Sequence, residues 1–395
     1  MVMKRGVHMS QDSTKAMIAE VFNDIANGIK SGQFKKKVRI GLTILGSEHG
    51  IEEMVSAAEL AKAKYGDFDI VLIGPKVDGD FEVVEVQTAE EGHKKMTTML
   101  ENGELDGCVT QHFDFPIGVS TVGKVATPGR GRDMIIATTT GTTSTNRVEG
   151  MVMNAISGIS VAKANGIKNP RVGILNLDGA RQVERILKEV QDNGYDFEFT
   201  QSLRADGGAV MRGNDLLAGT PDVMVCDSLT GNLLVKVFSS FTTGGNYETV
   251  GAGYGPGIGE NYDKLVNIVS RASGAPLIAE ALRYCATCAE NKVLDIARDE
   301  FKKANKAGLK EVIEKTIKKA AKTEVAEEVK MPAKKVVTYS IAGIDILELE
   351  NACKALWKED IYSESGMGCT GPIVLVAEED SEKAMEILKK AEYMA

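Results

Sequence analysis

Cys369 is the residue of this chain whose type and setting best suit covalent chemistry. It lies in the glycine-rich stretch 365–372, beside Thr370 and just before the apolar run 373–376. Glycines allow a sharp turn and the close approach of another molecule, and the apolar run predicts a buried strand that would hold the loop. A thiolate there could act as a nucleophile. A tight turn whose cysteine packs as a small apolar side chain is the alternative, and the residues alone leave both open.

Two hydroxyl-rich stretches, 138–146 and 227–232, follow predicted strands and open onto predicted helices. Helix N-termini offer free N–H groups and the positive end of a dipole to anions, and ligands of open α/β sheets collect at the carboxyl ends of strands. The predicted phosphate-binding residues are Thr140, Gly141, Thr142, Thr143, Ser144 and Asn232. The alternative is two independent turns with ordinary hydroxyl caps. No lysine stands at the spacing of a P-loop.

Five further cysteines need an interpretation. Cys108, which follows Gly107 at a predicted strand, is the second candidate for a reactive thiol, with a core position as its alternative. Cys285 and Cys288 form a CxxC motif, but no second pair or paired histidines lie nearby in the sequence, which favours packed helix cysteines over a zinc or redox site. Cys226 and Cys353 are predicted core residues. The four histidines are scattered, and none lies near Cys369 in the sequence.

The elements that must position these residues alternate between strand and helix. Strands are predicted at 38–45, 69–75, 81–86, 106–110, 134–137, 172–177 and 223–227, and helices at 51–64, 89–102, 148–164 and 181–193. This alternation is typical of a parallel α/β sheet. The glycine-rich segment 244–259 is expected to be a mobile loop. It is not a dinucleotide fingerprint, because no strand precedes it and a proline interrupts it.

The two ends of the chain differ from the middle. Apolar residues at three- and four-residue steps predict an amphipathic helix at 14–30, within an N-terminal extension of residues 1–36. Residues 37–330 are expected to form the main α/β region, with two lobes around a cleft. Residues 331–395 form a predicted small α/β module with strands at 336–340 and 373–376 and helices at 346–358 and 381–393, and this module carries the Cys369 loop.

Composition limits the class of protein. The net charge of −9, from 47 basic and 56 acidic residues, argues against nucleic acid as the main partner. No apolar run is long enough to span a membrane, and the N-terminus has no apolar segment typical of a signal peptide. A cytoplasmic location with free thiols is the expectation. We see no acidic cluster typical of a metal site, so neither a metal nor a bound cofactor is expected.

Several stretches carry a resemblance to known families. Residues 225–236 and the order of strands from 38 to 279 resemble the phosphate acyltransferases of fatty acid and phospholipid synthesis, which are similar in fold to phosphotransacetylases and isopropylmalate dehydrogenases. Residues 127–133, 138–147 and 366–372 together resemble the family of component C alpha subunits of glycine/sarcosine/betaine reductase complexes. The small C-terminal module, a departure from plain phosphate acyltransferases, fits that second family.

The resemblance implies a reaction and partners. A selenoprotein A carrier would present a carboxymethyl group, a thiol of component C would receive it reductively as an acetyl thioester, and phosphate as co-substrate would release acetyl phosphate. Cys369 would hold the acetyl group, and N–H groups of Gly368, Thr370 and Gly371 would stabilise the oxyanion. A component C beta subunit is the implied partner in a hetero-oligomer. The rivals are a stand-alone transferase that uses coenzyme A or acyl carrier protein, and a non-catalytic scaffold subunit. A metal- and NAD-dependent dehydrogenase is the weakest alternative.

Overall fold

The computed structural model describes residues 37–204, 207–324, 329–368, 371–391, 393 and 394, together with residues 22 and 26. The predicted helix at 14–30 and the rest of the N-terminal extension therefore lie outside the described residues.

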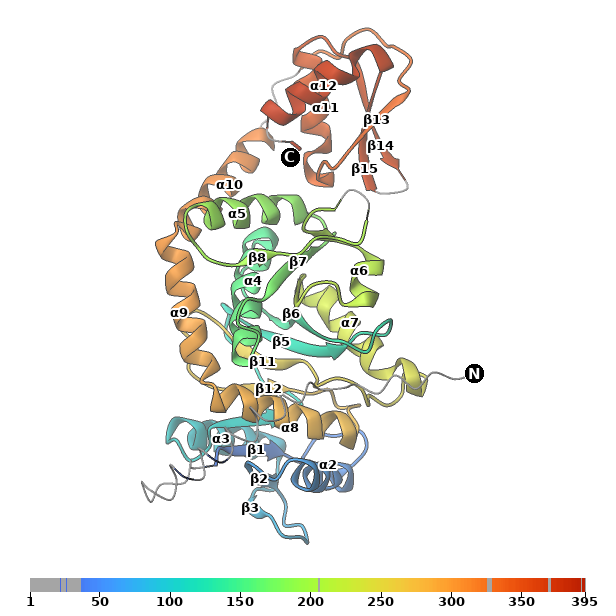
Figure 1. Ribbon diagram of the computed structural model, residues 1–395. Helices are drawn as coiled ribbons and strands as arrows, with labels where there is room; N and C mark the ends of the chain where they lie inside the picture. The colour runs from blue at the N-terminus through green and yellow to red at the C-terminus, as the bar shows by residue number, and fades with distance from the viewer. Residues whose placement is uncertain are drawn as a thin grey trace.

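Among the described residues, twelve strands form one large sheet (Figure 1). Its order is β3-β2-β1-β4-β12-β11-β5-β6-β10-β7-β8, and β9 pairs with β7. The strands are β1 (Arg39–Thr43), β2 (Asp69–Gly74), β3 (Glu82–Glu85), β4 (Gly107–Thr110), β5 (Val119–Ala126), β6 (Asp133–Thr142), β7 (Arg171–Leu175), β8 (Glu198–Phe199), β9 (Val210–Met211), β10 (Val223–Val225), β11 (Gly255–Ile258) and β12 (Val266–Ile268). The predicted α/β fold is thereby confirmed.

The sheet consists of two parallel halves joined by an antiparallel centre. β3, β2, β1, β4 and β12 pair in parallel, as do β6, β10, β7 and β8. Between them, β11 runs antiparallel to both β12 and β5, and β5 runs antiparallel to β6. The sequence prediction missed β5. It was also wrong about the glycine-rich segment, because residues 252–259 are buried and contain β11.

Helices cover both faces of the large sheet. They are α2 (Ile51–Lys64), α3 (Ala89–Glu101), α4 (Arg147–Ala164), α5 (Ala180–Asp192), α6 (Gly213–Ala218), α7 (Ser228–Ser240), α8 (Ala275–Glu290), α9 (Val293–Lys306) and α10 (Leu309–Glu324). One apolar core contains buried residues of α2, α4, α5, α8 and α9. The other contains buried residues of α3, α6 and α7. Helices α4 and α7 therefore lie on opposite faces of the sheet.

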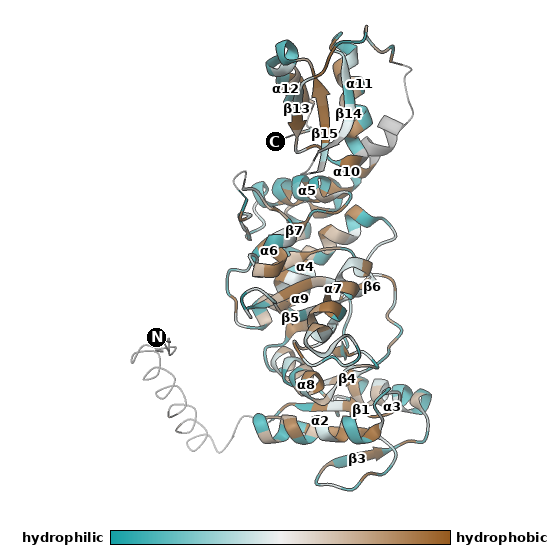
Figure 2. Cartoon of the chain, turned by 90° about the vertical axis from the view of Figure 1, so that its right-hand side faces the viewer, coloured by the Kyte–Doolittle hydropathy of each residue, from teal (hydrophilic) through white to brown (hydrophobic). Residues whose placement is uncertain are grey.

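The C-terminal residues form a separate three-stranded antiparallel sheet with a core of its own (Figures 1 and 2). Its elements are β13 (Tyr339–Ala342), α11 (Leu349–Lys358), β14 (Ser363–Gly368), β15 (Gly371–Val376) and α12 (Ser381–Lys390), with β15 in the centre. The prediction missed β14, whose glycines suggested a loop. Contacts to α5 hold this unit: Gly179 N–H donates to Asp345 Oδ1 at 3.4 Å, and Arg185 pairs with Glu348 at 2.7 Å.

Candidate functional site

The hydroxyl-rich stretch connects the end of β6 to the start of α4, and its first hydroxyls are built into the sheet. Thr138 and Thr139 are buried. Thr138 Oγ1 donates to the Thr121 carbonyl at 2.5 Å, and Thr139 Oγ1 donates to the Tyr254 carbonyl at 2.6 Å. These bonds fix the strand end, so the residues that follow it are presented from a rigid support.

The stretch 227–232 meets this connection directly. It begins α7, where Asp227 caps the helix by accepting a hydrogen bond from Thr230 N at 2.8 Å. The Asn232 side chain donates to the Thr139 carbonyl at 3.1 Å. Gly231 lies so close to Thr138 that a Cβ added there would stand 2.8 Å from the Thr138 carbonyl carbon. The two stretches, predicted separately, therefore lie in contact with each other, although each also carries an ordinary helix cap, at Asn146 and at Asp227. Their binding of phosphate stays a prediction.

A cation that the sequence reasoning did not single out lies at this junction. Arg147 is the first residue of α4, and its guanidinium pairs with Asp227 at 2.5 Å and with Asp178 at 3.6 Å. Burial alone would raise the pKa of Asp227, but hydrogen bonds from Thr230 and the Arg147 guanidinium outweigh it and lower the pKa. The sequence does contain a signal that could have indicated Arg147, because this arginine directly follows the hydroxyl-rich stretch and the helix cap Asn146.

Some of the predicted phosphate-binding hydroxyls already form hydrogen bonds within the protein, and others do not. Thr143 Oγ1 bonds to Asn154 Oδ1 at 2.7 Å, and Ser144 Oγ donates to Glu149 Oε2 at 2.6 Å. The hydroxyls of Thr140 and Thr142 form no hydrogen bond with other described residues, and Thr142 is exposed. Thr140 and Thr142 could therefore bind an anion without first losing an internal partner.

The segment around Cys369 joins two paired strands. β14 ends at Gly368, β15 begins at Gly371, and these two glycines are register partners. Cys369 and Thr370 lie outside the described residues, so the structure does not test the predicted nucleophile. In both views β15 runs away from the large sheet, so it begins on the side that faces α5 (Figures 1 and 2).

Cys108 lies in the interior of β4 with no exposed surface. A Cβ added to Gly41 on the neighbouring strand would stand 2.9 Å from its Sγ. Burial raises the pKa of the Cys108 thiol, although weak backbone hydrogen bonds at Thr43 and Val109 oppose the rise. A buried, protonated thiol is a poor nucleophile, which favours a core role over a catalytic one.

The CxxC cysteines occupy α8 as free, buried thiols. Burial raises the pKa of Cys288 to about 12. The described residues contain no group of three or more His, Cys, Asp or Glu that could hold a metal ion. Cys226 and Cys353 are likewise free and buried, as predicted. These environments fit the interpretation of packed helix and core cysteines.

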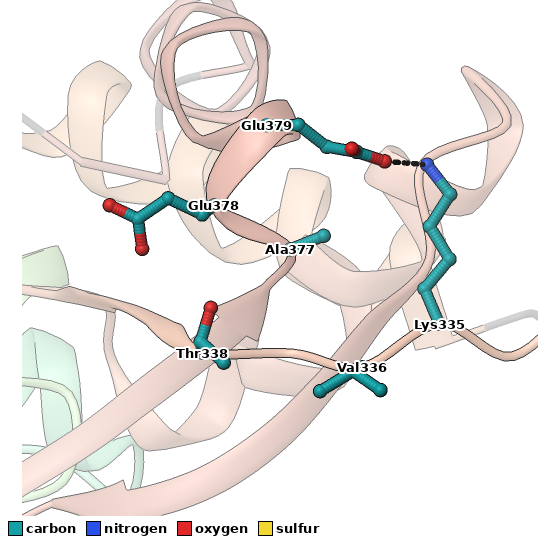
Figure 3. A pocket seen from close by; sticks show the side chains of 6 residues that line it. All are labelled: Lys335, Val336, Thr338, Ala377, Glu378 and Glu379. Carbon is teal, nitrogen blue, oxygen red and sulfur yellow. Dashed lines mark hydrogen bonds and ion pairs between the residues drawn. The ribbon is translucent and has the colours of Figure 1, made fainter.

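A shallow hollow on the small C-terminal unit contains none of the predicted site residues (Figure 3). Its lining residues are Lys335, Val336, Thr338, Ala377, Glu378 and Glu379. Lys335 pairs with Glu379 at 3.0 Å across its rim. In the part of the chain that the structure describes, no helix is both long and apolar enough to cross a membrane.

Comparison with known proteins places the chain in a family. The model of a family described as "Fatty acid synthesis protein" matches residues 38–375. The glycine/sarcosine/betaine reductase complex component C subunit alpha of Peptoclostridium acidaminophilum is 58% identical over 381 residues, which is 96% of this chain and 99% of that protein. A phosphate acyltransferase of Thermotoga petrophila is 28% identical over 51% of this chain and 67% of its own.

Among solved structures, a branched-chain phosphotransacylase from Enterococcus faecalis aligns with a TM-score of 0.43 and 16% identity, over 63% of this chain and 98% of its own. The match to the reductase subunit spans 96% of this chain, whereas the match to the phosphate acyltransferase spans about half of it. The chain therefore belongs to the fatty acid synthesis protein family and, within it, to the component C alpha subunits of glycine/sarcosine/betaine reductase complexes.

Proposed function

We propose that this chain forms acetyl phosphate as a subunit of a glycine/sarcosine/betaine reductase complex. The observation that carries the proposal is the 58% identity to a component C alpha subunit over 96% of the chain. The relation to phosphate acyltransferases supports acyl-phosphate chemistry. In the proposed reaction, Cys369 holds an acetyl group as a thioester, and phosphate releases the group as acetyl phosphate.

In the first step, the conversion of the carboxymethyl group into an acetyl group requires two electrons. A carboxymethyl selenoether on a selenoprotein A carrier reacts with a thiol of that carrier and with the Cys369 thiol. The carrier thiol attacks selenium and closes a selenium–sulfur bond, and the displaced carbon takes the electron pair and a proton to become a methyl group. The Cys369 sulfur bonds to the carboxyl carbon and one oxygen leaves as water. The carrier is thereby oxidised, and the product is an acetyl thioester.

In the second step, a phosphate oxygen attacks the thioester carbonyl, and the thiolate of Cys369 leaves. Thioesters are good acyl donors because the thiolate is a good leaving group. The N–H groups of Gly368, Thr370 and Gly371 would bind the developing oxyanion. Two glycines that end paired strands support this role, since they allow a close approach of substrate.

Phosphate would bind where the two hydroxyl-rich stretches meet. The hydroxyls of Thr140 and Thr142, which have no hydrogen-bond partner among the described residues, would donate hydrogen bonds to it. The Arg147 guanidinium, which pairs with Asp227 at the start of α7, would supply positive charge. Gly141, Thr143, Ser144 and Asn232 would shape the loop. Asn232 already fixes the strand end through its bond to the Thr139 carbonyl. No bound cofactor is part of this proposal; phosphate is a substrate.

The partners in this proposal are a component C beta subunit and the selenoprotein A carrier, which together make a hetero-oligomer. The alternative function is a stand-alone phosphate acyltransferase that uses coenzyme A or acyl carrier protein. It is favoured by the family match, which runs from residue 38 to residue 375. The alternative predicts activity with acetyl coenzyme A and no selenoprotein.

The test is the arsenate-dependent hydrolysis of acetyl phosphate by the purified chain. Arsenate replaces phosphate on an acetyl-enzyme and gives an unstable acyl arsenate. We expect turnover in the wild type and in Cys353→Ala, a control in the same C-terminal unit, and none in Cys369→Ala with unchanged circular dichroism. Equal turnover in Cys369→Ala would refute that residue as the acetyl carrier, and Cys108→Ala would then be assayed.

A further inference from the structure

The small C-terminal unit lies beside helix α5, and Asp345 makes one of the contacts between them (Figure 1). Its buried carboxylate accepts a hydrogen bond from the Gly179 N–H at 3.4 Å. Gly179 is the N-cap residue of α5, with a φ of 87°, and as a glycine it has no side chain to cap the helix. A carboxylate at a helix N-terminus is favoured by the free N–H groups and by the helix dipole. Asp345 therefore supplies, from the other unit, the anion that this helix start lacks.

A second carboxylate of the C-terminal unit, that of Glu348, pairs with α5. Its Oε1 lies 2.7 Å from the Arg185 guanidinium, and its Oε2 is buried with no hydrogen-bond partner among the described residues. Loss of the guanidinium would leave a carboxylate that is only 17% exposed without its ion-pair partner, which disfavours the docked position. Ile344 and Leu349, each next to one of the two carboxylate residues, are buried in the core of the unit. The two carboxylates are thereby fixed relative to the rest of the unit.

The start of α5 also contacts the candidate phosphate site. A Cβ added to Gly179 would stand 2.8 Å from Val148 Cγ2, and Val148 directly follows Arg147 in α4. Asp178, the residue before Gly179, pairs with Arg147 at 3.6 Å. The glycine that donates to the C-terminal unit is thus packed against the first turn of α4, which carries the proposed phosphate-binding cation.

We propose that Asp345 and Glu348 are positioning residues, which seat the C-terminal unit on α5 so that its Cys369 segment is presented to the phosphate site. This inference rests on the proposed function, in which Cys369 carries the acetyl group. β15 begins on the side of the unit that faces α5 (Figures 1 and 2), so the connection between β14 and β15 is directed toward the main region. Transfer of an acetyl group from a thiol to phosphate requires the two reactants to be held together, and a docked unit keeps the thiol at a high effective concentration.

The test combines small-angle X-ray scattering of the full chain with arsenate-dependent hydrolysis of acetyl phosphate. Arg185→Glu and Glu348→Arg each place like charges together, so each is expected to enlarge the radius of gyration and to lower kcat about tenfold. Circular dichroism and the KM for acetyl phosphate should change little, because the main region remains folded and binds the phosphate group.

Two further variants separate docking from general damage. The double variant Arg185→Glu with Glu348→Arg restores an ion pair and is expected to recover most of the compactness and of kcat. Lys188→Glu is the matched control, because Lys188 is an exposed cation of α5 that pairs with Asp192 inside the same helix. It is expected to keep the wild-type radius of gyration and kcat.

Several outcomes would overturn the proposal. An unchanged radius of gyration in both Arg185→Glu and Glu348→Arg would show that the pair does not hold the unit. An enlarged radius with the wild-type kcat would show that acetyl transfer does not need the docked unit. A wild-type chain without turnover would refute the proposed function and the positioning role with it, while the scattering would still decide whether the pair docks the unit. Asp345→Asn keeps an acceptor oxygen but loses the charge, and it serves if the reversed charges prevent folding. It is expected to lower kcat about threefold, and an unchanged kcat would remove Asp345 from the positioning residues.

Discussion

Gly231→Ala tests the contact between the two hydroxyl-rich stretches. Gly231 lies inside α7, where alanine ordinarily stabilises a helix by about 0.5–1 kcal/mol relative to glycine. Here the new Cβ would stand 2.8 Å from the Thr138 carbonyl carbon, nearer still to its oxygen, and 3.0 Å from the Cys226 Sγ. Two of these neighbours are backbone atoms of Thr138 within strand β6, so they cannot move as a flexible side chain would.

Overpacking of this kind typically costs about 1–3 kcal/mol. We therefore expect Gly231→Ala to lower the free energy of unfolding by about 1–2 kcal/mol after the helix gain is subtracted. Because Thr138 leads into Thr140 and Thr142, we also expect the KM for phosphate to rise in the proposed reaction. Urea unfolding followed by circular dichroism measures the first effect, and initial rates measure the second.

The matched control is Gly150→Ala in the first turns of α4. A Cβ there would meet its nearest atoms, those of Ser144, at 3.7 Å or more, which is ordinary contact. This variant should gain about 0.5–1 kcal/mol. If Gly231→Ala were as stable as Gly150→Ala, the close packing of the two stretches and the reasoning built on it would be refuted.

Three other predictions follow from the site. Arg147→Ala should raise the KM for phosphate about tenfold, because a charge-assisted contact of about 1.4 kcal/mol is lost, whereas the exposed Arg298→Ala should change it little; equal effects would remove Arg147 from the phosphate site. Asp227 has a lowered pKa, so its ion pair stabilises the fold above the unfolded pKa of about 4 and is lost as the pH falls through the folded value. Urea unfolding should show a free energy of unfolding about 1 kcal/mol higher for the wild type than for Asp227→Asn near pH 7, and this difference should shrink as the pH falls below the unfolded pKa of about 4; a difference that does not change with pH would contradict the ion pair. Brief alkylation of the native chain, read by mass spectrometry, should label Cys369 first and leave buried Cys108 unlabelled, and fast labelling of Cys108 would contradict its core position.

Local patterns were sufficient for most of the helices and parallel strands. The apolar run of β2 and the periodic apolar positions of α4 follow from burial on one face or both, which is a property of neighbouring residues. The pattern failed at β11 and β14, whose glycines suggested loops. At Gly257 the reason is visible, since a Cβ would collide with the Phe115 ring: the glycine serves close packing within the sheet, and this depends on a residue far away in the sequence.

The sequence by itself determined the α/β class, the hydroxyl-rich stretches and, through residues 366–372, the family to which the chain belongs. Only the tertiary structure decided that the two hydroxyl-rich stretches are in contact, that Arg147 pairs with both Asp227 and Asp178, and that Cys108 is buried in the core. Each of these depends on strand order, which brings β6 beside β10 and β4 beside β1. Strand order follows from long-range pairing, and no local run of residues encodes it.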